Sequence, residues 1–335
     1  MASWLLKLLR VLKPTASVYI YEFYPKKIAA QIDYLQRVKS SIGKVNLQYN
    51  ERHYGVGGNM AYTLKGSHVG ITFAGPQGSP LSLQLFLDGR EFTQKLMLTC
   101  FSKGKLYEPE VSRLFLAFLT EGDVVIDVGA HVGYFSLLAA TLVGNSGRVI
   151  ASEMCRDNIM RLFYHCQLNS LPNIQIVEGA IGNCQQEVSF YVNQDNDGGH
   201  ALWDVGKHPY NQKSASNPVQ KRVTMRTLDS ITRELNIDRI KLIKMDVEGA
   251  EPLVLEGGKT TIVNCKPPFV ICEINKFALQ QMGYDPMIVR HFFSDLGYDS
   301  YLITDRLLPL PAGENYGQGL YNLLFARGDI AKDLL

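Results

Sequence analysis

Long apolar runs, cysteine motifs and an excess of charge are all missing from this 335-residue chain. No uninterrupted apolar stretch approaches the ~18–20 residues that span a bilayer, so we expect no transmembrane segment. The six cysteines form no Cys-x-x-Cys and none stands at metal-clip spacing with a histidine, which favours reduced thiols and a cytoplasmic location. The formal charge of +2 gives no whole-chain reason to expect nucleic acid as a partner.

The composition that remains, 46% hydrophobic and 20% charged, is ordinary for a folded protein. Residues 1–50 show helical spacing of apolar side chains, and residues 50–100 combine many glycines with short alternating runs that are typical of strands. Asp88-Gly89 indicates a hairpin turn. We therefore predict an N-terminal α+β extension over residues 1–104, helical and then β-rich, to which the sequence assigns no role.

Residues 4–12 are apolar with basic interruptions and end before Pro14. This segment is too short and too charged for a signal-peptide core, and no small-residue cleavage site follows it. One interpretation is an interfacial helix that touches a membrane. We favour the other, a terminal helix that packs on its own domain or on a second subunit of a homodimer.

Residues 105–335 alternate strands and helices, which is the pattern of a mainly parallel sheet. Strands are predicted over 124–128, 148–153, 174–177, 188–192, 240–246, 269–274, 300–304 and 320–326. Helices are predicted over 133–143, 157–169, 250–255 and 286–296, with another beginning at 227. The polar stretch 193–218 is predicted to be a long loop, and such loops on these sheets usually serve as lids or binding elements.

The motif Asp127-Val128-Gly129-Ala130-His131-Val132-Gly133 lies between a predicted strand and a predicted helix. Its glycines let the backbone turn sharply and approach a ligand closely. A dinucleotide site would need Gly-x-Gly-x-x-Gly, whereas the spacing here is Gly-x-x-x-Gly. The carboxylate of Asp127 would oppose a pyrophosphate on the helix N-terminus, but it suits a ligand with an ammonium and a sulfonium group. The motif therefore favours S-adenosylmethionine, with Asp127, Gly129, His131 and Gly133 as contacts.

Two further strand ends support a nucleoside ligand. Glu153 ends the next predicted strand, where a carboxylate can accept hydrogen bonds from both ribose hydroxyls. This role is common to NAD and S-adenosylmethionine, so Glu153 does not choose between them. After the third strand, Ala180 lies where a loop would flank the adenine.

A second block, residues 240–251, leads from a buried strand through Asp246, Glu248 and Glu251 into a helix. In an open parallel sheet, ligands lie beyond the carboxyl ends of the strands at the switch point. We therefore expect strands 124–128 and 240–246 to be neighbours and Asp246 to face the reacting end of the cofactor. Glu251 is better suited to cap the following helix.

Several ordered motifs together closely resemble the FkbM-type methyltransferases: Tyr107 to Glu110, Asp127 to Ser136, Thr227 to Asp229, Lys244 to Glu251, and Gly257. The resemblance covers about residues 105–327, and Glu108 in the first motif joins the predicted cofactor contacts. It implies a Rossmann-like methyltransferase fold, doubly wound and mainly parallel with a final antiparallel strand, and O-methylation of sugars, polyketides or other natural products. The sequence departs from the family pattern at His131, where Asn is usual, and at Met154, where Pro is usual.

Methyl transfer to a hydroxyl is an in-line displacement that needs a positioned acceptor and a base for its proton. We predict Asp246, Glu248 and His200 as catalytic residues, with His208 as a further candidate base. His200 follows two glycines in the long loop, so loop closure could bring its imidazole over the cofactor.

A divalent metal held by Asp246, Glu273 and Asn275 at adjacent strand ends is an alternative, because oxygen ligands suit Mg²⁺. The spacing does not demand a metal, and we predict none.

Three function classes stay open. The methyltransferase interpretation predicts turnover on a small-molecule or saccharide acceptor, by transfer to oxygen or, as a narrower rival, to nitrogen or carbon. A nicotinamide-dependent oxidoreductase would want the missing Gly-x-Gly-x-x-Gly. A non-catalytic scaffold protein would keep the fold but would not need Asp127, Glu153 and Asp246 together.

Overall fold

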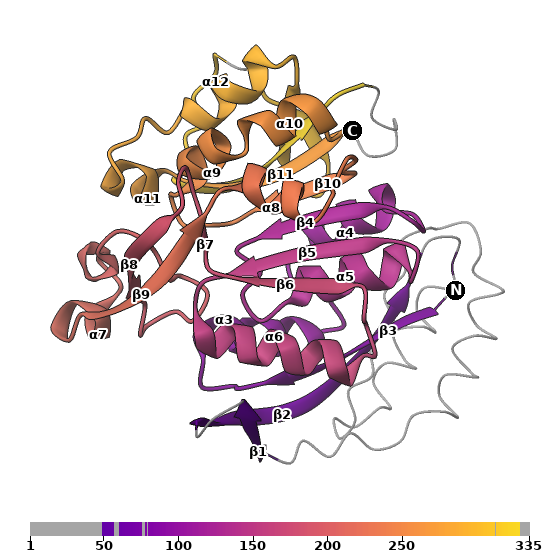
Figure 1. Cartoon of the computed structure of the whole chain (residues 1–335), viewed down its shortest axis with the longest axis vertical. Helices are drawn as coiled ribbons and strands as arrows, with labels where there is room; N and C mark the ends of the chain where they lie inside the picture. The colour runs from indigo at the N-terminus through magenta and orange to yellow at the C-terminus, as the bar shows by residue number, and fades with distance from the viewer. Residues whose placement is uncertain (1–48, 57–59, 76–77, 79, 312, 329–335) are drawn as a thin grey trace, which may run out of the picture.

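The computed structural model describes residues 49–56, 60–75, 78, 80–311 and 313–328, and its centre is one eight-stranded sheet (Figure 1). The strand order is β13-β12-β14-β11-β10-β4-β5-β6. Strands β11, β10, β4, β5 and β6 run parallel, whereas β14 runs antiparallel to β11. The strands are β4 Val124–Val128, β5 Arg148–Glu153, β6 Ile174–Glu178, β10 Leu242–Met245, β11 Phe269–Asn275, β12 Asp299–Ile303, β13 Leu307–Pro309 and β14 Leu320–Ala326. The predicted doubly wound, mainly parallel sheet with a final antiparallel strand is confirmed.

Helices cover both faces of this sheet (Figure 1). Successive side chains of β4 point to opposite faces: Val125 packs in the core under α4 and α5, and Ile126 packs in the core under α8, α9 and α12. The helices are α3 Phe92–Ser102, α4 Pro109–Phe118, α5 Tyr134–Val143, α6 Arg156–Leu168, α7 Gln212–Ser216, α8 Leu228–Glu234, α9 Glu251–Gly257, α10 Lys259–Cys265, α11 Lys276–Gln281 and α12 Ile288–Asp295. Strand β4 is therefore buried on both faces of the sheet, with apolar side chains packed against the helices on each side.

Two smaller sheets flank this core. The antiparallel sheet β1-β2-β3 packs through β3 on α5 and α6, on the far side of these helices from the central sheet (Figure 1). The sheet β7-β9-β8 stands beyond the carboxyl ends of the parallel strands (left in Figure 1). The strands are β1 Tyr49–Val56, β2 Met60–Ala74, β3 Pro80–Leu87, β7 Ala180–Ile181, β8 Gln186–Val192 and β9 Val219–Arg226.

The hairpin predicted at Asp88-Gly89 is wrong, because helix α3 follows β3 instead of another strand. The side chain of Asp88 accepts a hydrogen bond from the backbone N–H of Arg90 at 3.0 Å, and the chain then enters the helix at Phe92. An acidic residue followed by glycine therefore forms a strand-to-helix turn here.

The hydrophobic core crosses the predicted boundary at residue 105. Leu83, Leu85 and Met97 of the extension belong to the same buried cluster as Leu114 and Phe115. The division into 1–104 and 105–335 stays a prediction, but the described part of the extension shares its hydrophobic core with residues 105–335.

The helical segment predicted over 1–50 and the apolar segment 4–12 lie outside the described residues except for the last two positions, which begin β1. Across the described ranges, no helix combines the length and the apolar character that crossing a bilayer would require.

A buried histidine joins the first sheet to the central domain. Nε2 of His165, on α6, accepts a hydrogen bond from the N–H of Phe86 at 2.8 Å, and its Nδ1 donates to the carbonyl of Val132 at 2.7 Å. This pattern requires the neutral ring with its proton on Nδ1. Burial lowers the pKa of His165 to about 4, so the ring stays neutral at physiological pH.

Replacing His165 by Gln should change how stability depends on pH. The folded-state pKa of about 4 lies below the ordinary value of 6.5, so the stabilisation is complete above pH 6.5 and is lost as the pH falls towards 4. Over that window the wild type should lose about 3 kcal/mol that the variant does not lose. Urea unfolding at pH 7 and pH 4.5 measures this difference, with the exposed His291→Gln as control. A gap between wild type and variant that stays constant with pH would show that His165 is not held neutral.

Candidate active site

A cavity of about 330 Å³ opens at the carboxyl ends of the parallel strands. Its walls come from the ends of β4, β5, β10 and β11, from the loop 193–211 and from helix α3. Among the residues that line it are all the predicted site residues but one: Glu108, Asp127, Gly129, His131, Glu153, Ala180, His200, Asp246 and Glu248. The exception is Gly133, where an added Cβ would lie 2.2 Å from Cδ1 of Leu162. This glycine allows close packing of α5 on α6 and does not line the cavity.

Asp127 lies at the floor of the cavity. Its Oδ2 accepts a hydrogen bond from Oγ of Ser136 at 2.6 Å, and its buried Oδ1 has no partner among the described residues. Burial raises the pKa of Asp127, while Lys244 opposes that shift. A buried acceptor without a partner costs free energy, so Oδ1 is suited to receive a donor from a bound ligand.

Gly129 brings two loops into contact. Its φ of +84° is in the left-handed region, and an added Cβ would stand 1.9 Å from the carbonyl oxygen of Asp246. Only glycine fits this position, because both the backbone conformation and the lack of space exclude a side chain. The loops that follow β4 and β10 therefore touch, as the predicted pairing of these strands requires.

Glu153 and His131 are linked through the backbone. The two carboxylate oxygens of Glu153 accept hydrogen bonds from the N–H of Cys155 and the N–H of His131, each at 2.8 Å. His131 has a φ of +52°, which is a conformation that His and Asn adopt more readily than most residues. The exchange of the usual Asn for His131 is therefore compatible with the local backbone.

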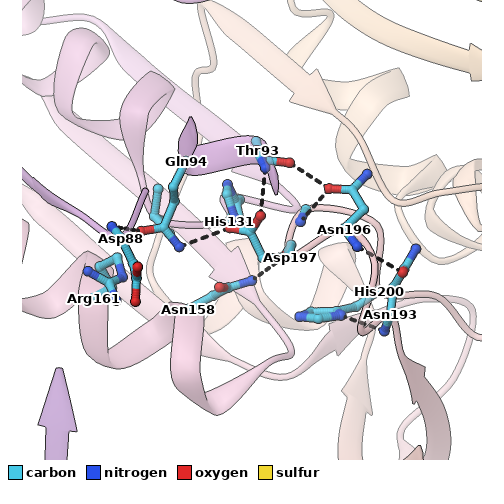
Figure 2. Close-up of polar contacts among 12 residues, drawn as sticks. Asp88, Thr93, Gln94, His131, Asn158, Arg161, Asn193, Asn196, Asp197 and His200 are labelled. Atoms are coloured by element: carbon cyan, nitrogen blue, oxygen red, sulfur yellow. Dashed lines mark hydrogen bonds and ion pairs between the residues drawn. The ribbon is translucent and has the colours of Figure 1, made fainter. Parts of the chain in front are cut away.

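The ring of His131 is turned to Asp197, a residue that the sequence analysis missed (Figure 2). Its Nε2 lies 2.8 Å from Oδ2 of Asp197, which also accepts from Nε2 of Gln94 at 2.9 Å, while Oδ1 accepts from the N–H of Thr93 at 2.7 Å. Although burial opposes ionisation, these hydrogen bonds hold the pKa of Asp197 at about 2. Asp197 thus ties together helix α3, the loop after β4 and the long loop. In the sequence, Asp197 is one of several polar residues in the stretch 193–218, and nothing in that stretch indicates its partners.

A buried lysine organises the carboxylates. Lys244 pairs with Asp127 in the β4–β10 register, and its Nζ lies 2.9 Å from Oδ2 of Asp246. Burial disfavours the charge of Lys244, but Asp246, Asp127 and Glu108 together raise its pKa. Lys244 was predicted only as part of the motif Lys244 to Glu251, yet a lysine inside a buried strand needs such partners.

Beside this ion pair, Asp246, Glu248 and Glu273 each place a carboxylate oxygen within 4.8 Å of the others. Asn275 donates from Nδ2 to Oε2 of Glu248 at 3.0 Å. Burial and the nearby Asp246 raise the pKa of Glu248 to about 8, and the same two causes raise that of Glu273 well above its ordinary value. The carboxyl group of Glu248 can therefore hold and release a proton near neutral pH. The oxygens of Asp246, Glu248 and Glu273 also have the spacing to hold a divalent cation.

His200 and Glu251 are occupied by local contacts. Nδ1 of His200 accepts from the N–H of Asn193 at 3.0 Å, and burial lowers the pKa of His200 to about 4. Glu251 accepts from the N–H groups of Val247 and Gly249, each at 3.3 Å, so it serves the turn before α9. The case for His200 as a base is therefore weaker than the case for the carboxylates.

Comparisons with known proteins place this region in context. The sequence pattern of the methyltransferase FkbM domain matches residues 127–300, just over half of the chain. Over 169 residues the chain is 28% identical to the 2-O-methyltransferase NoeI of Sinorhizobium fredii; the match covers 47% of this chain and 66% of NoeI, slightly under two thirds of that relative.

Similar solved structures include methyltransferase FkbM from Methylobacillus flagellatus KT, at 14% identity and a TM-score of 0.40 over 70% of this chain and 54% of that one. Another is a putative rRNA methylase from Clostridium thermocellum, at 10% identity and a TM-score of 0.38 over 65% of this chain and 93% of that one.

Replacing Gly129 by Ala should unfold the site, whereas Gly283→Ala should be mild. Both glycines have φ near +80°, but an added Cβ at Gly283 meets no atom within 4 Å. We expect Gly283→Ala to cost about 1–2 kcal/mol of backbone strain, and Gly129→Ala to cost at least about 3 kcal/mol because it adds the clash. Thermal or urea unfolding compares the two, and equal losses would contradict the contact between the loops.

Proposed function

Because the chain belongs to the family of FkbM-type, S-adenosylmethionine-dependent methyltransferases, we propose that it methylates a hydroxyl oxygen of a small-molecule or saccharide acceptor by in-line displacement. The observation that carries this proposal is that one cavity is lined by Asp127, by Glu153 and by the carboxylate cluster of Asp246, Glu248 and Glu273. The acceptor oxygen and its base would be held together at that point. Transfer to nitrogen or carbon on the same fold is the alternative.

The cavity residues fit the proposed cofactor. The unpartnered Oδ1 of Asp127 can accept from an ammonium group, and the carboxylate of Glu153 has lone pairs left for ribose hydroxyls. Gly129 permits close approach, and Ala180 lines the side expected for adenine. When bound, S-adenosylmethionine would supply an electrophilic methyl group on a sulfonium.

We assign the proton of the acceptor hydroxyl to Glu248, beside which Glu273 places a carboxylate oxygen within 4.8 Å. Lys244 holds one side of Asp246, which leaves Glu248, with its pKa raised to about 8, as the group that can exchange a proton near that pH, while burial and Asp246 raise the pKa of Glu273 well above its ordinary value. His200, with a pKa of about 4, would accept a proton less readily and is better suited to donate a hydrogen bond from Nε2.

The charge of the cavity favours an uncharged acceptor. Six carboxyl groups line it, whereas the one lysine among the residues that line it is already paired with Asp246. The side chains are Glu108, Asp127, Glu153, Asp246, Glu248 and Glu273. The lining therefore offers no free cation to pair with a phosphate close to the reacting hydroxyl, which supports our proposal that the acceptor is not a nucleic acid.

We also propose a reducing compartment such as the cytoplasm. All six cysteines are free thiols, and burial raises the pKa of Cys155 and of Cys166 to about 12. Thiols with so high a pKa carry little thiolate and react slowly. Free thiols without disulfides are typical of proteins in reducing compartments.

Glu153→Gln should weaken cofactor binding, whereas Glu178→Gln should not. The two glutamates are register partners at the ends of β5 and β6, but Glu178 is exposed and pairs with Arg156. We expect the loss of the Glu153 carboxylate to lower affinity for S-adenosylhomocysteine at least about tenfold, because charged hydrogen bonds are worth roughly 1.5–3 kcal/mol. Calorimetric titration of both variants measures this, and equal affinities would remove Glu153 from the site.

Glu248→Gln should abolish the pH dependence of methyl transfer. With the pKa of Glu248 at about 8, the active base is depleted at lower pH, so kcat/KM of the wild type should rise with pH up to about 8. The variant should lose about 100-fold or more in rate and show no such rise. Transfer of a labelled methyl group to neutral glycosides measures the profile, with the exposed Glu256→Gln as control. An unchanged profile in Glu248→Gln would place the base elsewhere.

A further inference from the structure

Three large hydrophobic side chains at the cavity are left in contact with solvent. Phe92 and Leu96 of α3 are 52% and 43% exposed, and Leu320 at the start of β14 is 54% exposed. Only seven exposed large hydrophobic side chains occur in the part of the chain that the structure describes, and these three all line the same cavity. A single exposed leucine needs no explanation, but a group of exposed apolar side chains in the lining of a cavity that also holds six carboxyl groups indicates a binding surface.

Helix α3 is fixed in place by the polar network around Asp197 (Figure 2). Asp197 accepts from the N–H of Thr93 and from the side chain of Gln94, and Oε1 of Gln94 accepts in turn from the N–H of Asp88. Phe92 and Leu96 are four residues apart, so they share the outer face of this anchored helix. Their exposure is therefore a property of a rigidly held element, and not of a loose helix end.

Leu320 lies beside the carboxylates. It pairs with Asn275 in the β11–β14 register, and Asn275 donates its side-chain hydrogen bond to Glu248. An apolar side chain thus stands one strand away from the group that is to receive the proton of the acceptor. A ligand whose hydroxyl reaches Glu248 would bring its neighbouring atoms towards Leu320.

We propose that Phe92, Leu96 and Leu320 bind the apolar part of an amphipathic acceptor. Its uncharged, hydroxyl-bearing head enters the acidic cavity, and an alkyl or aromatic group attached to that head lies on the three side chains. This inference rests on the proposed function, and it gives the N-terminal extension a role, since α3 supplies two of the three contacts. The continuity of the apolar surface with the cavity favours the acceptor itself over a protein partner or a membrane, which would not need to reach Glu248.

Matched alkyl glycosides test this proposal directly. The probes are methyl β-glucoside, octyl β-glucoside below its micelle concentration, and octyl β-glucuronide, which adds one carboxylate to the same head. Binding to the full chain saturated with S-adenosylhomocysteine would be measured by ligand-observed NMR. Each buried methylene strengthens binding severalfold, so we expect octyl β-glucoside to bind at least about tenfold more tightly than methyl β-glucoside. The glucuronide should bind at least about tenfold more weakly than octyl β-glucoside, because the cavity lining has no unpaired cation to bind its carboxylate.

The double variant Phe92→Ser and Leu96→Ser should lose most of the preference for the octyl chain, and Leu320→Ser should lose part of it. Phe163→Ser is the matched control, since Phe163 is 44% exposed on α6 and does not line the cavity. Equal affinity for methyl and octyl β-glucoside, no binding of either, or a preference that survives the double variant would overturn the proposal. A glucuronide that binds as well as octyl β-glucoside would overturn the uncharged head.

Binding of S-adenosylhomocysteine distinguishes a wrong acceptor proposal from a wrong methyltransferase proposal. A chain that binds the cofactor product but ignores the octyl group contradicts only the amphipathic acceptor. A folded chain that does not bind it contradicts the methyltransferase site itself.

Discussion

The close approach of two loops, after β4 and after β10, is the constraint on which the rest of the site depends. An added Cβ on Gly129 would lie 1.9 Å from the carbonyl oxygen of Asp246, so the two chain segments meet without a side chain between them. This contact places the carboxylate of Asp127 and the carboxylate of Asp246 in one cavity, although they lie 119 positions apart in the sequence. Parallel pairing of β4 with β10 fixes the register, and the doubly wound topology makes this the point where a ligand binds.

Charge balance is the second constraint. Carboxyl groups buried together would repel one another, and only Lys244 among the residues that line the cavity carries a permanent positive charge. Lys244 forms an ion pair with Asp246, while burial and the nearby Asp246 raise the pKa values of Glu248 and Glu273. Strand β10 and the loop that follows it therefore supply both the ion pair of Lys244 with Asp246 and the raised-pKa carboxyl of Glu248, a division of roles that suits acid–base chemistry.

The sequence predicted the parts of the fold that depend on local pattern. Mostly apolar runs, each with one charged residue, identified β4 and β10, and the glycine motif after β4 identified the cavity, because burial and backbone turning leave a direct trace in the residue types. Strand β9 was missed, since its sequence Val-Gln-Lys-Arg-Val-Thr-Met-Arg is largely polar and exposed, although it is the middle strand of a small three-stranded sheet. Asp197 was missed because its partners Thr93 and Gln94 lie about a hundred residues away, and no local pattern encodes that contact. The same holds for the exposed apolar face of α3, which follows a turn that was predicted to be a hairpin.

Cofactor binding tests the central claim most directly. The full chain would be titrated calorimetrically with S-adenosylmethionine and, separately, with NADH, alongside Asp127→Ala and the isosteric Asp127→Asn, with folding of each variant checked by circular dichroism. Our account predicts micromolar binding of S-adenosylmethionine to the wild type, none of NADH, and loss of binding in both variants. A folded wild type that fails to bind S-adenosylmethionine, or that binds NADH instead, would contradict it.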